Sequence, residues 1–280
     1  MAHDHVPDAE NILDKEYKVL DKGFVRLVDY MGGDARIVQA ARVSYGKGTK
    51  TKRQDRGLIN YLMRNQHTSP FEQVILTFHC KMPLFVARQW VRHRTARLNE
   101  ISGRYSVMEN EFYVPDSEQI SYQSEDNKQG RNQDETVPAE LQQKVLDIIT
   151  SGHKQAYDQY NEMLDENIAR ELARINLPLS LYTQWYWQID LHNLFHFLKL
   201  RMDAHAQWEI RQYAKKMGEI TDKVAPMAYQ AFETHMLNSV TFSGIEMKAL
   251  ASLLKGEEYS LNPTAQADFE RKIEKIKNSH

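Results

Sequence analysis

The chain has 280 residues, and its 36 lysines and arginines nearly balance its 38 aspartates and glutamates, giving a formal net charge of −2. This balance excludes a generally basic nucleic-acid-binding protein, and the absence of any run near ~18 apolar residues excludes a membrane span. A single cysteine, Cys80, excludes an intrachain disulfide framework and is typical of a reducing compartment. The amino-terminal residues carry no signal-peptide pattern, so we expect a cytoplasmic location.

Hydrophobic periodicity predicts strands at 24–30 and 74–82. The second is the clearest, because its apolar residues alternate with polar ones and share one face: Val74, Leu76, Phe78, Cys80 and Met82. Helices are predicted at 34–42, 55–65, 84–93, 139–165, 167–174 and 190–222. The helix at 84–93 follows Pro83, which suits a first helical turn, and the last begins at Asp190, a suitable N-cap.

Strands in the first half of the chain and helices in the second half indicate an α+β fold with a mixed or antiparallel sheet and long helices. Residues 1–16 are polar and are expected to form a tail. Residues 17–280 are expected to form one domain. The stretch 116–137, rich in Ser, Gln, Asn and Asp, is expected to leave that domain as a polar surface excursion.

Residues 88–104 contain five arginines and His93 with one acid, Glu100, and no lysine. A guanidinium is planar and always charged, and its fork of donors matches a phosphate or a carboxylate. One interpretation is a solvated basic surface. However, apolar residues such as Trp90 and Leu98 are interleaved with the arginines, so we expect partial burial, where an arginine needs a paired anion. A single glutamate cannot pair with five arginines, which favours a functional anion site.

Arg201 lies close to the apolar spine of the predicted helix at 190–222, and the residues alone leave two interpretations open. Its guanidinium could reach a neighbouring carboxylate, Asp203 or Glu209. Alternatively, it is held in a dry pocket, where it polarises a substrate.

A metal site and a cysteine nucleophile are both disfavoured by the sequence. His192 and His196 have the spacing of metal ligands on a helix, but Asn193 stands where the zincin motif has glutamate. Cys80 shares the apolar face of a strand with Phe78, which predicts an inert core residue rather than an exposed reactive thiol. We therefore expect no metal.

Four ordered blocks of the chain resemble the flavin-dependent thymidylate synthases. They are Arg92-His93-Arg94 with Ser102-Gly103-Arg104-Tyr105-Ser106 seven residues later, and the stretches 67–72, 85–90 and 200–209. The resemblance covers roughly residues 20–225. It implies an α+β fold and a homotetramer with active sites shared between chains. It also implies bound FAD, NADPH as reductant, and methylenetetrahydrofolate as one-carbon donor to dUMP.

The same resemblance assigns roles to individual residues. Arg201 is implied to be the catalytic residue that pairs with the uracil ring. The implied FAD contacts are Ser69 from a neighbouring chain, Arg92, His93, Arg94, Glu100, Asp190, His192 and His196. The implied dUMP contacts are Gln89, Trp90, Val91, Arg92, Glu100, Ile101, Ser102, Gly103, Arg104, Arg174 and Arg201. His67 and the 44–50 loop lie where the family places folate and cofactor contacts.

The chain departs from the family pattern at three places, one of which is the polar excursion at 116–137. Arg97 stands where many members have serine, which adds a charge to the arginine-rich segment. Asp190, Leu191 and His192 stand where many members have Asn-Ala-Arg. An acid and a histidine cannot make the same flavin contacts as that tripeptide.

The implied reaction agrees with the residue types. Other thymidylate synthases activate uracil by adding a cysteine to the ring, whereas this chain has no suitable cysteine, so activation must be electrostatic. The reduced flavin supplies the hydride. Two other functions remain as alternatives: a single-stranded nucleic-acid-binding module that uses residues 88–105, with Trp90 and Tyr105 as stacking platforms, and a helical metalloprotein.

Overall fold

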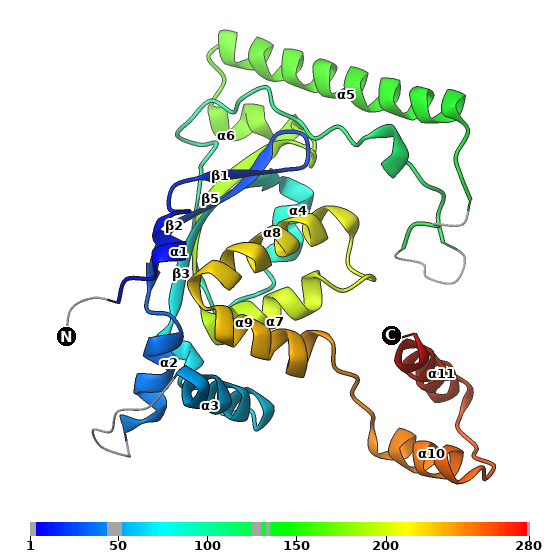
Figure 1. Cartoon of the computed structure of the whole chain (residues 1–280). Coiled ribbons are helices and arrows are strands. Elements are labelled where there is room, and N and C mark those ends of the chain that lie inside the picture. Colours follow the sequence, from blue (N-terminus) through cyan, green and yellow to red (C-terminus); the bar gives the residue numbers. More distant parts are fainter. Residues whose placement is uncertain (1–3, 44–51, 125–129, 133–134, 279–280) are drawn as a thin grey trace. The chain divides into compact units, whose positions relative to one another are not determined.

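The computed structural model describes residues 4–43, 52–124, 130–132 and 135–278. The chain separates into two compact units, Met1–Phe232 and Glu233–His280. A five-stranded antiparallel sheet with the order β1-β2-β3-β5-β4 forms the centre of the first unit (Figure 1). Its strands are β1 (Glu16–Val19), β2 (Gly23–Met31), β3 (Ile75–Pro83), β4 (Arg97–Glu100) and β5 (Tyr182–Asp190). Sheet and helices together confirm the α+β fold.

Strands β2 and β3 confirm the two predicted strands to within one residue at each end. The apolar alternation of β3 places Cys80 and its same-face neighbours in the core, where Cys80 is fully buried. Strand β5 was not predicted, although it lies between β3 and β4. Its signal is an alternation in which Trp185 and Trp187 are buried while Tyr186 is 45% exposed.

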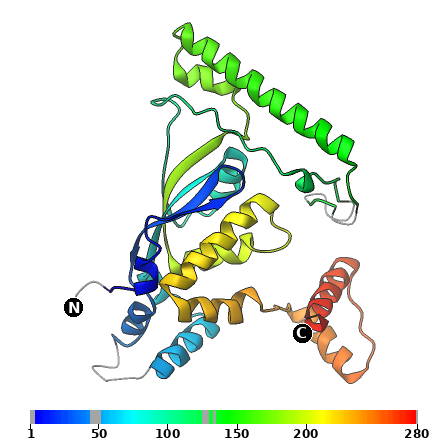
Figure 2. The ribbon, with the colours of Figure 1, turned by 45° about the horizontal axis from the view of Figure 1, so that its top comes forward.

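The helices of the first unit are α1 (Pro7–Glu10), α2 (Asp34–Ala41), α3 (Lys52–Arg64), α4 (Leu84–Trp90), α5 (Ala139–Asp165), α6 (Arg170–Ala173), α7 (Leu191–Arg201), α8 (Trp208–Val224) and α9 (Pro226–Phe232). Short 3-10 helices are η2 (Phe71–Gln73), η3 (Ser117–Gln119) and η4 (Arg174–Asn176). Figure 1 shows α7, α8 and α9 together on one side of the sheet, and Figure 2 shows α5 and α3 at opposite ends of this unit. No helix among the described residues is long and apolar enough to cross a membrane.

The predicted helix at 190–222 is wrong as a single element, because α7 ends at Arg201 and α8 starts only after residue 207. Asp190 caps α7 as expected, since its carboxylate accepts the backbone N–H of the third helical residue at 3.0 Å. The chain turns at 202–207, where the side chain of Asp203 accepts the backbone N–H of His205 at 2.8 Å. Such local side-chain bonds compete with the helical backbone pattern.

The other predicted helices differ from the structure mainly at their ends. Helix α5 has the predicted bounds 139–165. The helix predicted at 84–93 ends at Trp90. The segment 167–174 contains only the four residues of α6 before the chain tightens into η4.

The second unit consists of a π-helix η5 (Glu233–Leu237), α10 (Gly244–Lys255) and α11 (Pro263–Lys277). The side chain of Ser243 forms a capping box at the start of α10, and Glu246 of α10 pairs with Lys272 of α11 at 2.6 Å. Phe269 is fully buried. The single domain expected at 17–280 thus contains two compact units. In the expected tail, α1 holds a fully buried Ala9.

Candidate active site

The arginine-rich segment 88–104 runs from the end of α4 through a turn and β4 into a second turn. All its guanidinium-bearing residues are exposed: Arg88, Arg92, Arg94, Arg97 and Arg104. Part of the segment is buried as expected, because Trp90 is fully buried, but its arginines are not. Arg97 is exposed because β4 pairs with β5 alone, at the edge of the sheet, and all four of its residues are exposed.

Four of these guanidiniums lack an acidic partner among the described residues. No described carboxylate lies within ion-pair distance of those on Arg88, Arg92, Arg94 and Arg97. The one acid of the segment, Glu100, instead accepts the hydroxyl of Thr183 at 2.6 Å. Exposed, unpaired guanidiniums this close in sequence provide forked donors that fit the phosphates of a nucleotide or a dinucleotide.

Arg201, the last residue of α7, is held by two acceptors from α4 and the turn after it. Its Nε donates to Nε2 of His93 at 3.0 Å, and its Nη2 donates to the backbone oxygen of Gln89 at 3.1 Å. Neither acid considered from the sequence is its partner, because Asp203 pairs with His205 at 2.8 Å and Glu209 pairs with Arg131 at 2.5 Å.

The acceptors of Arg201 are electrically neutral. Burial, followed by the nearby charges of Arg201 and His196, lowers the pKa of His93 to about 4. Burial also lowers the pKa of the Arg201 guanidinium. His93 is therefore neutral at pH 7, and its Nε2 accepts a hydrogen bond. The guanidinium is oriented without being neutralised, so its charge can act on a ligand.

Trp90 supports this group from inside the core. It is fully buried, stacks on Phe197 with ring centroids 4.9 Å apart, and meets Trp185 and Trp187 edge-on at 5.5 and 5.4 Å. Its indole is inaccessible, so any contact of Trp90 with a ligand falls to its backbone. The adjoining Gln89 is half-buried rather than enclosed.

A second group of predicted residues meets where the turn at 102–106 contacts η4. A Cβ at Gly103 would lie 2.9 Å from Sδ of Met108 and 3.2 Å from Cδ of Arg174, so a larger residue requires both side chains to shift. The hydroxyl of Ser102 accepts the backbone N–H of Arg104 at 3.3 Å. Nε of Arg104 donates to a glutamate of α6 at 3.1 Å. We call Arg201, His93 and Gln89 the Arg201 group. Among the described residues, no hydrogen bond or ion pair joins the second group to it.

The remaining predicted residues lie apart from these two groups or have other partners. Ile101 is 37% exposed, Val91 is half-buried, and Ser69 is exposed in the loop before η2. His67 is exposed beside Tyr61, with ring centroids 5.7 Å apart. The loop at 44–50 lies outside the described residues.

Three residues predicted to contact the flavin belong to α7: Asp190 caps the helix, and His192 and His196 lie in it. The carboxylate of Asp190 is engaged by Asn193 at both oxygens, at 3.0 and 2.8 Å. The rings of His192 and His196 have centroids 4.7 Å apart, and burial, then His192, lowers the pKa of His196. No third His, Cys, Asp or Glu completes a metal-binding group within the part of the chain that the structure describes.

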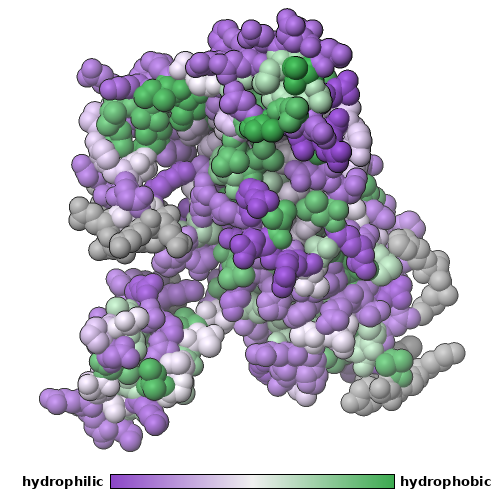
Figure 3. Space-filling view, turned by 180° about the vertical axis from the view of Figure 1, so that it is seen from behind, coloured by the Kyte–Doolittle hydropathy of each residue, from purple (hydrophilic) through white to green (hydrophobic). Residues whose placement is uncertain are grey.

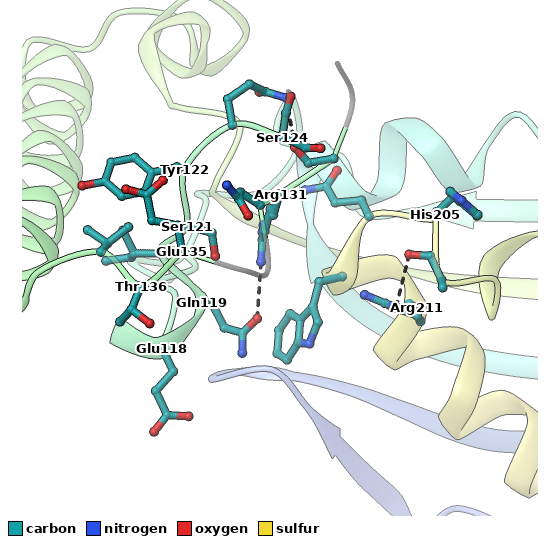
Figure 4. A pocket seen from close by; sticks show the side chains of 18 of the residues that line it. Glu118, Gln119, Ser121, Tyr122, Ser124, Arg131, Glu135, Thr136, His205 and Arg211 are labelled. Atoms are coloured by element: carbon teal, nitrogen blue, oxygen red, sulfur yellow. Dashed lines mark hydrogen bonds between the residues drawn. The ribbon is translucent and has the colours of Figure 1, made fainter. Parts of the chain in front are cut away.

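A cavity of about 860 Å³ lies between the polar excursion and the segment that joins α7 to α8 (Figure 4). Arg131 enters it from the excursion, and Arg211 enters it from α8. None of the predicted site residues that the structure describes lines this cavity, but Gln207 does, and Nε2 of Gln89 donates to Oε1 of Gln207. The cavity therefore adjoins the Arg201 group.

Gln207, Glu209 and Arg131 adjoin the Arg201 group through hydrogen bonds, but the sequence did not predict them as site residues. An available signal was Glu209 at the start of an apolar helix, because a buried acid needs a partner. That partner, Arg131, is 78 residues away in the chain. Its position depends on the tertiary fold, so local patterns do not reveal it.

Comparison with known proteins identifies the family of this chain. The family model "Thymidylate synthase complementing protein" matches residues 26–227. The flavin-dependent thymidylate synthase of Treponema denticola is 62% identical over 266 residues, which cover 95% of this chain and 98% of that protein. The protein of the same name from Treponema pallidum is 59% identical over 273 residues, covering 98% and 89%.

A solved structure is also similar to this chain. The UMP/dUMP methylase PolB of Streptomyces cacaoi, bound with 5-Br dUMP, superposes with a TM-score of 0.71 and 34% sequence identity. The match covers 79% of this chain and 99% of PolB. On the matched family model and these close relatives, the chain belongs to the family of flavin-dependent thymidylate synthases.

Proposed function

We propose that this chain converts dUMP to dTMP, with methylenetetrahydrofolate as the carbon donor and NADPH-reduced FAD as the hydride source. Its family membership supports the reaction, and its structural neighbour is a UMP/dUMP methylase. The observation that carries the proposal is Arg201, a half-buried guanidinium held by two neutral acceptors, His93 and the Gln89 carbonyl. A guanidinium that keeps its charge in this way suits the activation of the uracil ring of dUMP, which is neutral.

Arg201 is proposed as the catalytic residue. C5 of uracil becomes nucleophilic when negative charge develops on the ring, and a guanidinium against N3 and O2 stabilises that charge. Cys80 cannot substitute for it, because the thiol is fully buried and burial raises its pKa well above the usual range. Losing one preorganised donor of this kind costs about 3 kcal/mol, or roughly a hundredfold in rate.

The exposed guanidiniums suit FAD because its pyrophosphate needs fixed donors. Arg92, His93, Arg94 and Glu100 are proposed to hold the cofactor with Ser69 from a neighbouring chain, and Asp190, His192 and His196 complete the proposed set. When bound, reduced FAD supplies a hydride, which is chemistry of the cofactor itself. The chain's residues bind and orient the cofactor and exclude water around it.

The dUMP site is proposed to combine both groups of residues described above. Gln89 and Arg201 come from the Arg201 group, and Trp90, Val91 and Arg92 follow Gln89 in the chain. Ser102, Gly103, Arg104 and Arg174 come from the second group, and Glu100 and Ile101 directly precede it in the chain. The site is proposed to be shared between the chains of a homotetramer, which brings the two groups together. Exposed apolar side chains such as Leu172 and Ile175, at 57% and 74%, also suit such contacts. Hydrophobic groups interrupt the hydrophilic surface in Figure 3.

The purified protein tests the proposal. It is expected to be yellow, to lose its flavin absorbance when NADPH is added, and to form dTMP only with dUMP and methylenetetrahydrofolate present. Purification without flavin, together with failure to take up added FAD, would contradict the proposal. The nucleic-acid alternative predicts affinity that falls steeply with salt, and neither the family nor the net charge of −2 supports it.

A further inference from the structure

Glu209 is a buried carboxylate for which the proposed reaction has no use. It is 2% exposed, and three donors surround it: the hydroxyl of Tyr113 at 3.2 Å, Nε2 of Gln207 at 2.9 Å and Nη2 of Arg131 at 2.5 Å. A carboxylate only accepts hydrogen bonds, so each neighbour must donate. Burial, then Glu209, raises the pKa of Tyr113, which keeps its hydroxyl a donor.

Because Glu209 accepts hydrogen bonds, it determines the orientation of two side-chain amides, those of Gln207 and Gln89. A glutamine amide fits either way round when viewed alone, and its partners decide its direction. Gln207 must turn its NH₂ to Glu209, which leaves its Oε1 to accept from Nε2 of Gln89. Reversing either amide would set two oxygens against each other without a hydrogen between them. We call this chain of hydrogen bonds, from Glu209 through Gln207 to Gln89, the relay. It ends at Oε1 of Gln89.

Gln89 also holds Arg201, because its backbone oxygen accepts Nη2 of Arg201 at 3.1 Å. We propose that Glu209 fixes the direction of the Gln89 amide, so that Gln89 presents its carbonyl oxygen to the nucleotide and selects a hydrogen-bond donor there. This inference rests on the proposed function. Outside its phosphate, dUMP has two such donors, the uracil N3–H and the 3′-hydroxyl of the deoxyribose.

The relay gives the polar excursion a role. Arg131 belongs to the excursion, and its guanidinium supplies the positive charge that allows the Glu209 carboxylate to remain buried. Glu209 and Gln207 are positioning residues, since they act on the nucleotide through Gln89. The excursion thereby contributes to nucleotide selection from outside the Arg201 group.

Binding of substrate analogues tests the relay. Dissociation constants of the flavin-loaded protein are measured by calorimetry for dUMP, for 3-methyl-dUMP, which lacks the N3–H, and for 2′,3′-dideoxyuridine monophosphate, which lacks the hydroxyl. The unmodified protein is expected to bind one analogue about tenfold more weakly than dUMP, the loss of one hydrogen bond. That analogue identifies the donor.

In Glu209→Gln, the neutral amide lets the relay reverse, and the penalty for that analogue is expected to fall below about threefold. Gln207→Leu should give the same loss of discrimination while leaving the buried charge pair intact, and it carries the test if Glu209→Gln fails to fold. Arg211→Gln is the matched control: this residue lines the same cavity but donates to the backbone oxygen of Ala204 at 3.3 Å. It should keep the full penalty.

Two results would overturn the inference alone. One is an unmodified protein that binds dUMP and both analogues equally. The other is a pair of variants, Glu209→Gln and Gln207→Leu, that weaken all three ligands by the same factor, as a merely structural role would. An unmodified, flavin-loaded protein that does not bind dUMP would instead contradict the proposed function and the inference with it.

Discussion

Arg201 illustrates how neighbouring groups decide what one charged side chain can do. A carboxylate partner would neutralise the guanidinium, whereas His93 and the Gln89 carbonyl orient it and leave its charge available. The sequence placed Arg201 near the apolar spine of a helix but left its partner open. The partner came from a segment 108 residues away, which local periodicity does not reveal.

The neutral state of His93 is a measurable consequence of this arrangement. Its folded pKa of about 4 lies below the ordinary 6.5. The stabilisation from neutral His93 is therefore present above pH 6.5, declines as the pH falls below that value, and is lost below about pH 4. NMR of the imidazole is expected to show titration near pH 4, and a midpoint near 6.5 would contradict the proposed environment.

At the scale of elements, strongly patterned segments were predictable and short or mixed ones were not. Strand β3 and helix α5 follow their periodicities closely. Strand β4 has only four residues, all exposed, so it carries no apolar pattern. The break between α7 and α8 depends on hydrogen bonds of Asp203 that interrupt a continuing apolar spine.

Gly103, in the turn at 102–106 after β4, allows a test of the proposed contact between Arg174 and dUMP. In Gly103→Ala, the side chains of Met108 and Arg174 must both shift, and displacing the Arg174 guanidinium from dUMP should weaken dUMP binding by up to roughly tenfold. Calorimetry of the flavin-loaded protein measures this change. Gly152→Ala is the matched control, because nothing lies within 4 Å of a Cβ at that position in α5, and its dUMP affinity should be unchanged. Equal affinities in the two variants would contradict the expectation that the substitution displaces Arg174 from dUMP.

At the scale of the whole molecule, the four sequence blocks identified the family, and the structure separated their residues into two groups within one chain. The blocks name candidate site residues, because each block keeps its spacing. They did not predict which partners hold those residues. The carboxyl-terminal unit lies beyond the 26–227 match of the family model, and no motif of the resemblance covers it.

The carboxyl-terminal unit is expected to depend on pH through Glu246. Hydrogen bonds from Lys272, then from Ser243, lower the pKa of Glu246 to about 2. Because the folded pKa is depressed, this stabilisation is present above the ordinary value of 4.5 and is lost as the pH falls towards 2. Glu246→Gln should therefore speed amide hydrogen exchange in α10 and α11 at pH 7. Exchange at pH 7 indistinguishable from the unmodified chain would argue against this role.

Electrostatic activation by Arg201 is the central claim, and single-turnover dTMP formation by flavin-loaded variants tests it most directly. Arg201→Ala is expected to retain its flavin spectrum but form dTMP roughly a hundredfold more slowly. Cys80→Ala should retain a rate close to that of the unmodified protein. A full rate in Arg201→Ala, or loss of dTMP formation in a folded, flavin-loaded Cys80→Ala, would contradict the claim.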